Sequence, residues 1–160
     1  MLYAEIFKKN FNYDSLNETT HPESSINRIQ TIIFALDTTT LIPYILYILK
    51  NVNDTSIRNE LFRLIESYVL RRIITKESTK TYSKLFTDLI EKQILCANDF
   101  RQYMKDVDTT HKFPTDQELL SGFHHSSLIN KQALGVMYLI ETSQYDSKSS
   151  TIPLILKNIL

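Results

Sequence analysis

The chain has 160 residues, a formal net charge of zero, and ordinary globular proportions of hydrophobic (42%) and charged (22%) residues. These values argue against disorder, a fibrous architecture and any broad electrostatic attraction to DNA or anionic membranes. Only two glycines and four prolines occur, so we expect long helices joined by polar loops, in one all-α domain spanning residues 1–160.

The first third of the chain carries three helical patterns. Apolar residues recur at helical spacing within 1–11 and again within 23–36, on either side of the polar stretch "NYDSLNETTHPESS". In "DTTTLIPYILYILKN", a threonine can cap a third helix. Pro43 then falls in its first turn, where a missing backbone N–H costs least. This helix is expected to end near Lys50.

A fourth helix is predicted over residues 55–74, with Asn53 or Asp54 as its cap. Its apolar residues, at positions 57, 61, 62, 64, 65, 68, 69 and 73, cover most of the helix circumference. Helices that are apolar nearly all round are usually central, so this one is expected to be the buried spine of an array of seven or eight helices.

The remaining sequence predicts four more helices. "KESTKTYSKLFTDLIEKQIL" supplies a fifth and "ANDFRQYMKDV" a short sixth. Thr115 and Glu118 form a capping box that starts a seventh near Asp116. An eighth should run from Asn130 to about Thr142. Residues expected to face inward on the last two are Leu119, Leu120, Phe123, Leu134, Met137, Tyr138 and Ile140. The apolar segment 151–160, "TIPLILKNIL", could be a strand, a short helix or a docked tail.

The sequence carries no recognisable catalytic or cofactor motif. Two glycines are too few for a P-loop or a Rossmann fingerprint, and the four histidines include no pair at i, i+4. Adjacent His124 and His125 indicate a surface pair at a helix end, and Cys96 a small buried side chain. We therefore expect no catalytic residue, no metal and no cofactor.

Two further features of the sequence indicate the cellular compartment of the protein. The single cysteine cannot form an internal disulfide, and no charged start leads into an apolar signal region, so a reducing cytoplasm is expected. No apolar run approaches the roughly 20 residues that cross a bilayer. Membrane association is not expected.

Charge is distributed unevenly along the chain. Residues 58–84 contain seven basic and three acidic side chains, whereas residues 106–146 contain two basic and six acidic ones. Phosphate contacts require a basic face, so the candidate DNA contacts are Arg71, Arg72, Lys76 and Lys80. The alternative interpretation is a solvated helix end whose cations complement the helix dipole.

Glu66 lies on the helix that is expected to be buried. An unpaired buried carboxylate costs several kcal/mol, so an arginine partner is required. Arg63 lies three residues before Glu66, and Arg71 and Arg72 lie about a turn and a half after it. The sequence therefore predicts a structural clamp between Glu66 and one of these arginines.

Three segments, in order, resemble one family of proteins. These are "LDTTTLIPYILYIL", "LIESYVLRRIIT" and "FPTDQEL". They look like the Leu-Asp-…-Pro-…-Leu-Leu, Ile-Glu-Ser-Tyr-Leu-Val-Arg-Arg and Phe/Trp-Pro-Ser-Asp-Glu-Glu-Phe elements of the GmrSD-type, modification-dependent restriction proteins of prokaryotes. The likeness covers roughly residues 26–141, and its central element is the most specific.

In that family this helical region lies between a ParB-like nucleotide-binding domain, with an Asp-Gly-Gln-Gln-Arg motif, and an HNH-type nuclease domain. The sequence has no Gly-Gln-Gln-Arg, and it ends about where the nuclease segment would begin. The resemblance thus implies a non-catalytic connector that couples a nucleotide-dependent sensor to DNA cleavage in phage defence, with those two domains, and with DNA, as partners. A stand-alone protein-interaction module is the alternative, and self-association through exposed apolar surface is left open.

Overall fold

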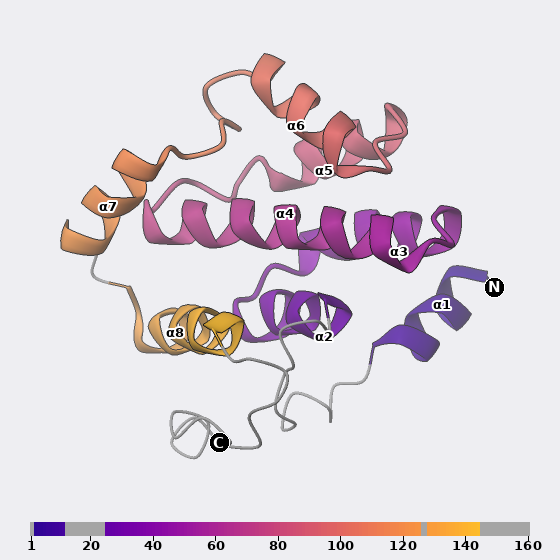
Figure 1. The fold of residues 1–160 in the computed structure, drawn as a ribbon, viewed down its shortest axis with the longest axis horizontal. Coiled ribbons are helices and arrows are strands. Elements are labelled where there is room, and N and C mark those ends of the chain that lie inside the picture. The colour runs from indigo at the N-terminus through magenta and orange to yellow at the C-terminus, as the bar shows by residue number, and fades with distance from the viewer. Residues whose placement is uncertain (1, 12–24, 126–127, 145–160) are drawn as a thin grey trace. The chain divides into compact units, whose positions relative to one another are not determined.

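The computed structural model describes residues 2–11, 25–125 and 128–144, which form eight α-helices and no strand (Figure 1). The all-α prediction is confirmed. Within these ranges no helix is long and apolar enough to cross a membrane. The segment 151–160 lies outside the described residues. Contacts divide the chain into two compact units, Met1–Thr38 with Leu128–Leu160, and Thr39–Ser127.

The first unit contains α1 (Leu2–Asn10), α2 (Ser25–Gln30) and α8 (Asn130–Gln144), and α2 continues as a π-helical turn over Thr31–Ala35. Its core is mainly aliphatic, because the helical stripe predicted within 23–36 meets the inner face of α8. The buried apolar side chains are Ile29, Ile32, Ile33, Leu36, Val136 and Leu139, together with the aromatic residues Phe11 and Tyr138.

A buried arginine also joins α2 to α8. Arg28 is 3% exposed, and its guanidinium donates to Thr142 Oγ1 at 2.9 Å and to the Leu139 carbonyl at 2.7 Å. Both acceptors lie in the C-terminal half of α8, the end at which the helix dipole favours a cation. The sequence analysis did not single out this residue.

The second unit is built around α4 (Thr55–Ile74), which has the predicted bounds. It also contains a 3₁₀ turn (Thr39–Leu41), α3 (Ile42–Asn51), α5 (Tyr82–Glu91), α6 (Ala97–Asp106) and α7 (Asp116–His125). Helices α6 and α7 both contact α4, and α3 contacts α5; Figure 1 shows α7 beside the C-terminal end of α4.

Helix α4 forms because its start is capped and most of its sides are apolar. The Asp54 carboxylate accepts hydrogen bonds from the Ser56 and Ile57 backbone N–H groups, at 2.8 and 3.1 Å. This satisfies two of the donors that a helix start leaves without partners. The side chains buried along it include Leu61, Phe62, Ile65, Tyr68 and Val69. Helix α4 is therefore the central helix that the sequence predicted.

Four predictions about individual residues were wrong. Leu41, not a threonine, is the N-cap of α3, because the 3₁₀ turn runs directly into that helix. Leu120 and Phe123 were expected to face inward, yet they are 62% and 52% exposed, and Met137 on α8 is also exposed.

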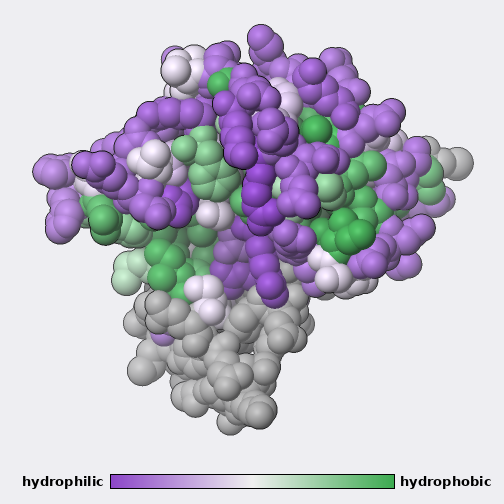
Figure 2. Space-filling model, turned by 45° about the horizontal axis from the view of Figure 1, so that its top comes forward, coloured by the Kyte–Doolittle hydropathy of each residue, from purple (hydrophilic) through white to green (hydrophobic). Residues whose placement is uncertain are grey.

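The exposure of α7 has a structural cause. The helix approaches α4 along its glycine side, since a Cβ on Gly122 would lie 2.9 Å from the Ile74 carbonyl oxygen. No described residue of α7 is buried. Green atoms reach the surface at the left of Figure 2, where α7 lies, so its apolar residues form part of the outer surface.

Two helices of the second unit end in left-handed residues that are not glycine. Lys76 follows α4 with φ 56°, and Gln93 follows α5 with φ 55°. At each end two backbone bonds close the last turn, for α5 Ile94 N–H to Leu89 O and Gln93 N–H to Ile90 O, both at 3.0 Å. This is a Schellman motif, in which glycine is usually preferred.

We predict that Gln93→Gly stabilises the protein by about 0.5–1 kcal/mol, because glycine removes the Cβ strain of the left-handed conformation. Thermal unfolding followed by circular dichroism measures the change. The matched control is Lys92→Gly, one residue earlier at φ −82°. There glycine should only loosen the helix end and lower the melting temperature. Equal effects of the two substitutions would contradict the prediction.

Candidate functional site

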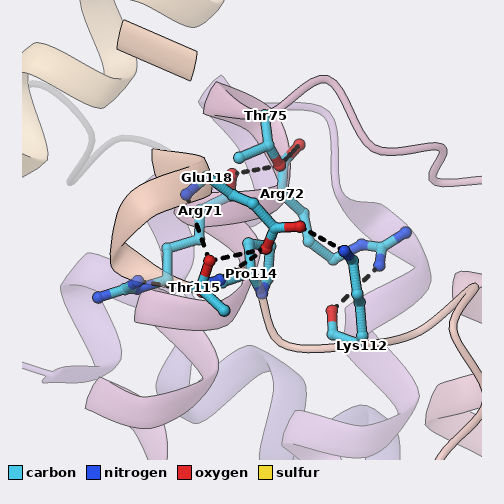
Figure 3. A network of polar contacts seen from close by, with 7 residues as sticks. All are labelled: Arg71, Arg72, Thr75, Lys112, Pro114, Thr115 and Glu118. Atoms are coloured by element: carbon cyan, nitrogen blue, oxygen red, sulfur yellow. Dashed lines mark hydrogen bonds and ion pairs between the residues drawn. The ribbon is translucent and has the colours of Figure 1, made fainter. Parts of the chain in front are cut away.

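The polar side chains of the second unit converge where the last turns of α4 meet the connection between α6 and α7. Figure 3 shows this network, to which α4 contributes Arg71 and Arg72, its C-cap residue is Thr75, and the connection contributes Lys112, Pro114 and Thr115. We call the group formed by Tyr68, Arg71, Arg72, Tyr82 and residues 108–118 the arginine cluster. It contains two of the four candidate DNA contacts.

Arg72 lies at the centre of the arginine cluster and is 1% exposed. Its guanidinium donates to the Ser78 carbonyl at 2.7 Å and, more weakly, to the Lys112 carbonyl at 3.4 Å. The guanidinium carbon also lies 5.6 Å and 5.5 Å from the ring centroids of Tyr68 and Tyr82. Carbonyl oxygens and aromatic faces therefore surround this cation.

Burial also changes the two tyrosines that pack on Arg72. It raises the pKa of Tyr82 to about 12, although the nearby Arg72 cation partly opposes the effect. The pKa of Tyr68 is raised for the same reason. Both rings therefore stay neutral at physiological pH and act as packing surfaces. Among the described residues the Tyr82 hydroxyl and Arg72 Nε have no hydrogen-bond partner.

Arg71 binds the start of α7 from the opposite side of the helix end. It donates to the Pro114 carbonyl at 3.0 Å and forms an ion pair with Asp116 at 2.6 Å. Its guanidinium carbon lies 5.7 Å from the centroid of the Phe113 ring. The Arg71 side chain is 22% exposed, so part of it remains accessible to solvent.

The capping box at the start of α7 is present as predicted. Glu118 accepts from the Thr115 backbone N–H at 2.9 Å, and the Thr115 hydroxyl accepts from the Glu118 N–H at 3.2 Å. Lys112 adds an ion pair to Glu118. Hydrogen bonding to Lys112, followed by the bonds from Thr115, lowers the pKa of Glu118 to about 2.

The candidate DNA contacts differ in accessibility. Lys76 and Lys80 are exposed, in the connection that follows α4. Arg71 is partly exposed and engaged by α7, and Arg72 is buried. A phosphate can therefore reach Lys76 and Lys80, and in part Arg71, whereas the Arg72 guanidinium offers it no surface. We withdraw Arg72 as a direct contact.

The residues of the predicted clamp also differ in their exposure to solvent. Glu66 is 8% exposed and Arg72 is 1% exposed, as a buried clamp requires, but Arg63 is exposed. Glu66 has an interaction partner, and Arg72 is held by the carbonyls of Ser78 and Lys112. The pairing of Glu66 with an arginine stays a prediction.

The remaining candidates offer little chemistry. Within the described ranges, no three His, Cys, Asp or Glu side chains are grouped so that they could hold a metal ion. Cys96 caps α6, where its sulfur accepts from the Asp99 N–H at 3.5 Å. His124 and His125 are exposed at the end of α7. A hollow of about 320 Å³ between α4 and α7 is lined by Lys76, Glu77, Glu118, Ser121 and His125 among others.

Comparison with known proteins identifies no relative of the chain. No protein-family model, no curated protein and no solved structure matches the chain.

We predict that Arg72→Ala destabilises the protein by about 3 kcal/mol or more, because it leaves a cavity and removes the donor from two partly buried carbonyls. Arg72→Lys should recover little of this loss, since an ammonium cannot reproduce the planar fork. Urea unfolding followed by circular dichroism measures both variants. Lys80→Ala is the matched control and should leave the midpoint unchanged. Full stability of Arg72→Lys would contradict the role assigned to the guanidinium.

The lowered pKa of Glu118 predicts a pH dependence of stability. A carboxylate whose folded pKa lies below its unfolded pKa stabilises the fold above the unfolded value, and this contribution is lost as pH falls. Glu118→Gln should therefore lower the melting temperature at pH 7 and have a much smaller effect at pH 2, where the carboxylate is already partly protonated in the folded protein. Glu91→Gln, an exposed residue at the end of α5, is the control. An equal loss for Glu118→Gln at both pH values would refute the prediction.

Proposed function

We propose that the chain is a non-catalytic helical connector of the kind found in GmrSD-type restriction proteins. In this role it would join a nucleotide-dependent sensor domain to a nuclease domain in the cytoplasm, and would itself contact DNA. The proposal rests on the resemblance of three sequence segments, and on what their residues do in the fold.

One observation carries the proposal: two of these segments, about 40 residues apart in sequence, are in direct contact with each other in the fold. "LIESYVLRRIIT" supplies Tyr68, Arg71 and Arg72, and "FPTDQEL" supplies the Phe113 ring, the Pro114 carbonyl and Asp116. Arg71 contacts all three of those groups. The Tyr68 and Phe113 rings are 5.5 Å apart. The residues that carry the resemblance in these two segments thus contact one another and position α4 against the start of α7.

The third segment has a comparable role. In "LDTTTLIPYILYIL", Leu41 and Tyr44 are fully buried. The Tyr44 hydroxyl donates to the Ile94 carbonyl at 2.8 Å, and its ring stacks on Phe86 of α5. These contacts fix α3 against α5. Positioning of helices, and not chemistry on a substrate, is the shared task of the residues in the three segments.

A connector must transmit displacement between the domains that it joins. Helix α4 has 20 residues, which corresponds to a length of about 30 Å. It is capped at Asp54 and held near its C-terminal end by the arginine cluster. The cap keeps the first turn of the helix intact, and the cluster ties its last turn to neighbouring segments. A helix stabilised in this way can move as a rigid body, which is the property that coupling requires.

The proposed DNA contact is the exposed part of the basic segment. Lys76 and Lys80 follow α4, next to partly exposed Arg71. They lie in a sequence region where basic residues outnumber acidic ones by seven to three. Such a local patch can bind phosphates even though the net charge of the chain is zero.

A stand-alone interaction module is the second candidate function, and the exposure of α7 favours it. Leu120 and Phe123 project into solvent three residues apart, so they share one face of the helix. Large exposed apolar side chains grouped in this way mark protein-binding surfaces. Binding through them would be insensitive to salt, unlike binding to phosphate.

The DNA contact can be tested by fluorescence anisotropy of a labelled duplex titrated at low and moderate salt. We expect Lys76→Ala/Lys80→Ala to weaken binding. The slope of log affinity against log salt should fall by about 0.9 for each phosphate contact removed. The double variant Lys8→Ala/Lys9→Ala removes the same charge from exposed positions of α1 and should bind like the unaltered protein.

Two results would contradict the proposal. An absence of binding at low salt by folded protein would eliminate the DNA contact and favour the interaction module. Robust cleavage of the duplex by the chain alone, with Mg²⁺ added, would overturn the assignment as non-catalytic.

A further inference from the structure

Arg71 holds the start of α7 through contacts of two kinds. On one side, its Nη1 donates to the Pro114 carbonyl at 3.0 Å in a partly buried bond, and its guanidinium carbon lies 5.7 Å from the Phe113 ring centroid. On the other side, its Nη2 pairs with Asp116 Oδ1 at 2.6 Å. The Asp116 side chain is 87% exposed, whereas that of Arg71 is 22% exposed. The guanidinium is therefore anchored by a carbonyl and a ring, and it also binds an exposed carboxylate.

These contacts differ in how easily they are exchanged. Water and dissolved ions compete for an ion pair that is open to solvent, so such a pair contributes little to stability. The bond to the Pro114 carbonyl is partly buried, and the contact with the Phe113 ring does not require the carboxylate. The Arg71 guanidinium can therefore release Asp116 and keep its place on the ring.

The carboxylate of Asp116 occupies a position that a phosphate oxygen can take. A guanidinium presents the same fork of donors to carboxylates and phosphates, and it binds both through charge-assisted hydrogen bonds. Lys76 and Lys80 follow the same end of α4 and are exposed. A duplex held by these lysines presents further phosphates at a high effective concentration, so DNA can compete for Arg71 where a dissolved phosphate ion cannot.

The first turn of α7 does not depend on this ion pair. Thr115 and Glu118 cap the helix reciprocally, through bonds of 2.9 and 3.2 Å. The helix dipole also favours Asp116 in this turn, whether or not Arg71 is bound to it. Loss of the pair therefore leaves α7 folded, but it removes a side-chain contact between the last turn of α4 and the first turn of α7.

We propose that Asp116 masks Arg71 as an internal competitor of DNA phosphate, and that Arg71 exchanges this carboxylate for a phosphate when a duplex binds. The inference rests on the proposed DNA contact and gives that contact a regulatory consequence. Because the exchange removes a contact between α4 and α7, bound DNA loosens the start of α7. A connector that contacts DNA can report its occupancy to α7 in this way.

The test is a double-mutant cycle on Asp116 and Arg71, in which fluorescence anisotropy at low salt measures the affinity for a labelled duplex. Asp116→Asn keeps the shape of the side chain and removes the competing charge. Asp106→Asn, the matched control, removes the same charge from an exposed residue at the end of α6. Asp116→Asn should tighten binding about two- to fivefold more than the control does, the range that an exposed ion pair spans. In the Arg71→Ala background this difference should disappear.

The outcomes separate the exchange from the DNA contact itself. If the unaltered protein binds and Asp116→Asn gains no more than Asp106→Asn, or if the gain is undiminished in Arg71→Ala, the exchange is refuted and the DNA contact stands. If neither the unaltered protein nor Asp116→Asn binds, both are refuted. If Arg71→Ala does not fold, the ¹³C signal of the Asp116 carboxylate in the unaltered protein decides. Saturating duplex should shift this signal, and an unmoved signal would overturn the exchange.

Discussion

The second unit depends on the burial of one cation, the guanidinium of Arg72. A buried charge is costly unless polar groups surround it, and here those groups come from three separate parts of the chain. Ser78 precedes α5, Lys112 precedes α7, and the Tyr68 and Tyr82 rings lie on α4 and α5. The charge is satisfied only when all of them are in place. The side chain therefore makes the packing of α4, α5 and the α6–α7 connection mutually dependent.

Local rules were sufficient to predict much of this fold. The bounds of α4 follow from an N-cap aspartate and an apolar pattern within 20 residues, and the capping box of Thr115 and Glu118 spans only four. Both are interactions between near neighbours, which the sequence displays directly. The partners of Arg72 could not be predicted in this way, because they are backbone carbonyls and every residue has one. The sequence prediction started instead from the Glu66 carboxylate, which requires a cation when buried, and it considered Arg72 as one possible partner for that group.

Three further features of the structure depend on what a one-dimensional pattern omits. Leu120 and Phe123 have helical spacing, but spacing does not say which face of α7 meets α4, and Gly122 allows the close approach on its own side. The ends of α4 and α5 carry no glycine signal, since lysine and glutamine occupy their left-handed positions. The burial of His111 was not predicted, because its ring contacts the Thr81 carbonyl, and only the arrangement of the chain in space brings these two residues together.

The arrangement also bears on how a connector could sense a ligand. Lys76 and Lys80 flank Ser78, and the Ser78 carbonyl accepts the shorter of the two Arg72 hydrogen bonds, at 2.7 Å. A phosphate bound by these lysines would therefore act on the segment that holds the buried cation. Any displacement of Ser78 changes the hydrogen bonding of Arg72, and through it the contacts of α4 with the connection that leads into α7. Binding at an exposed pair of lysines would thus affect a fully buried arginine through one intervening residue.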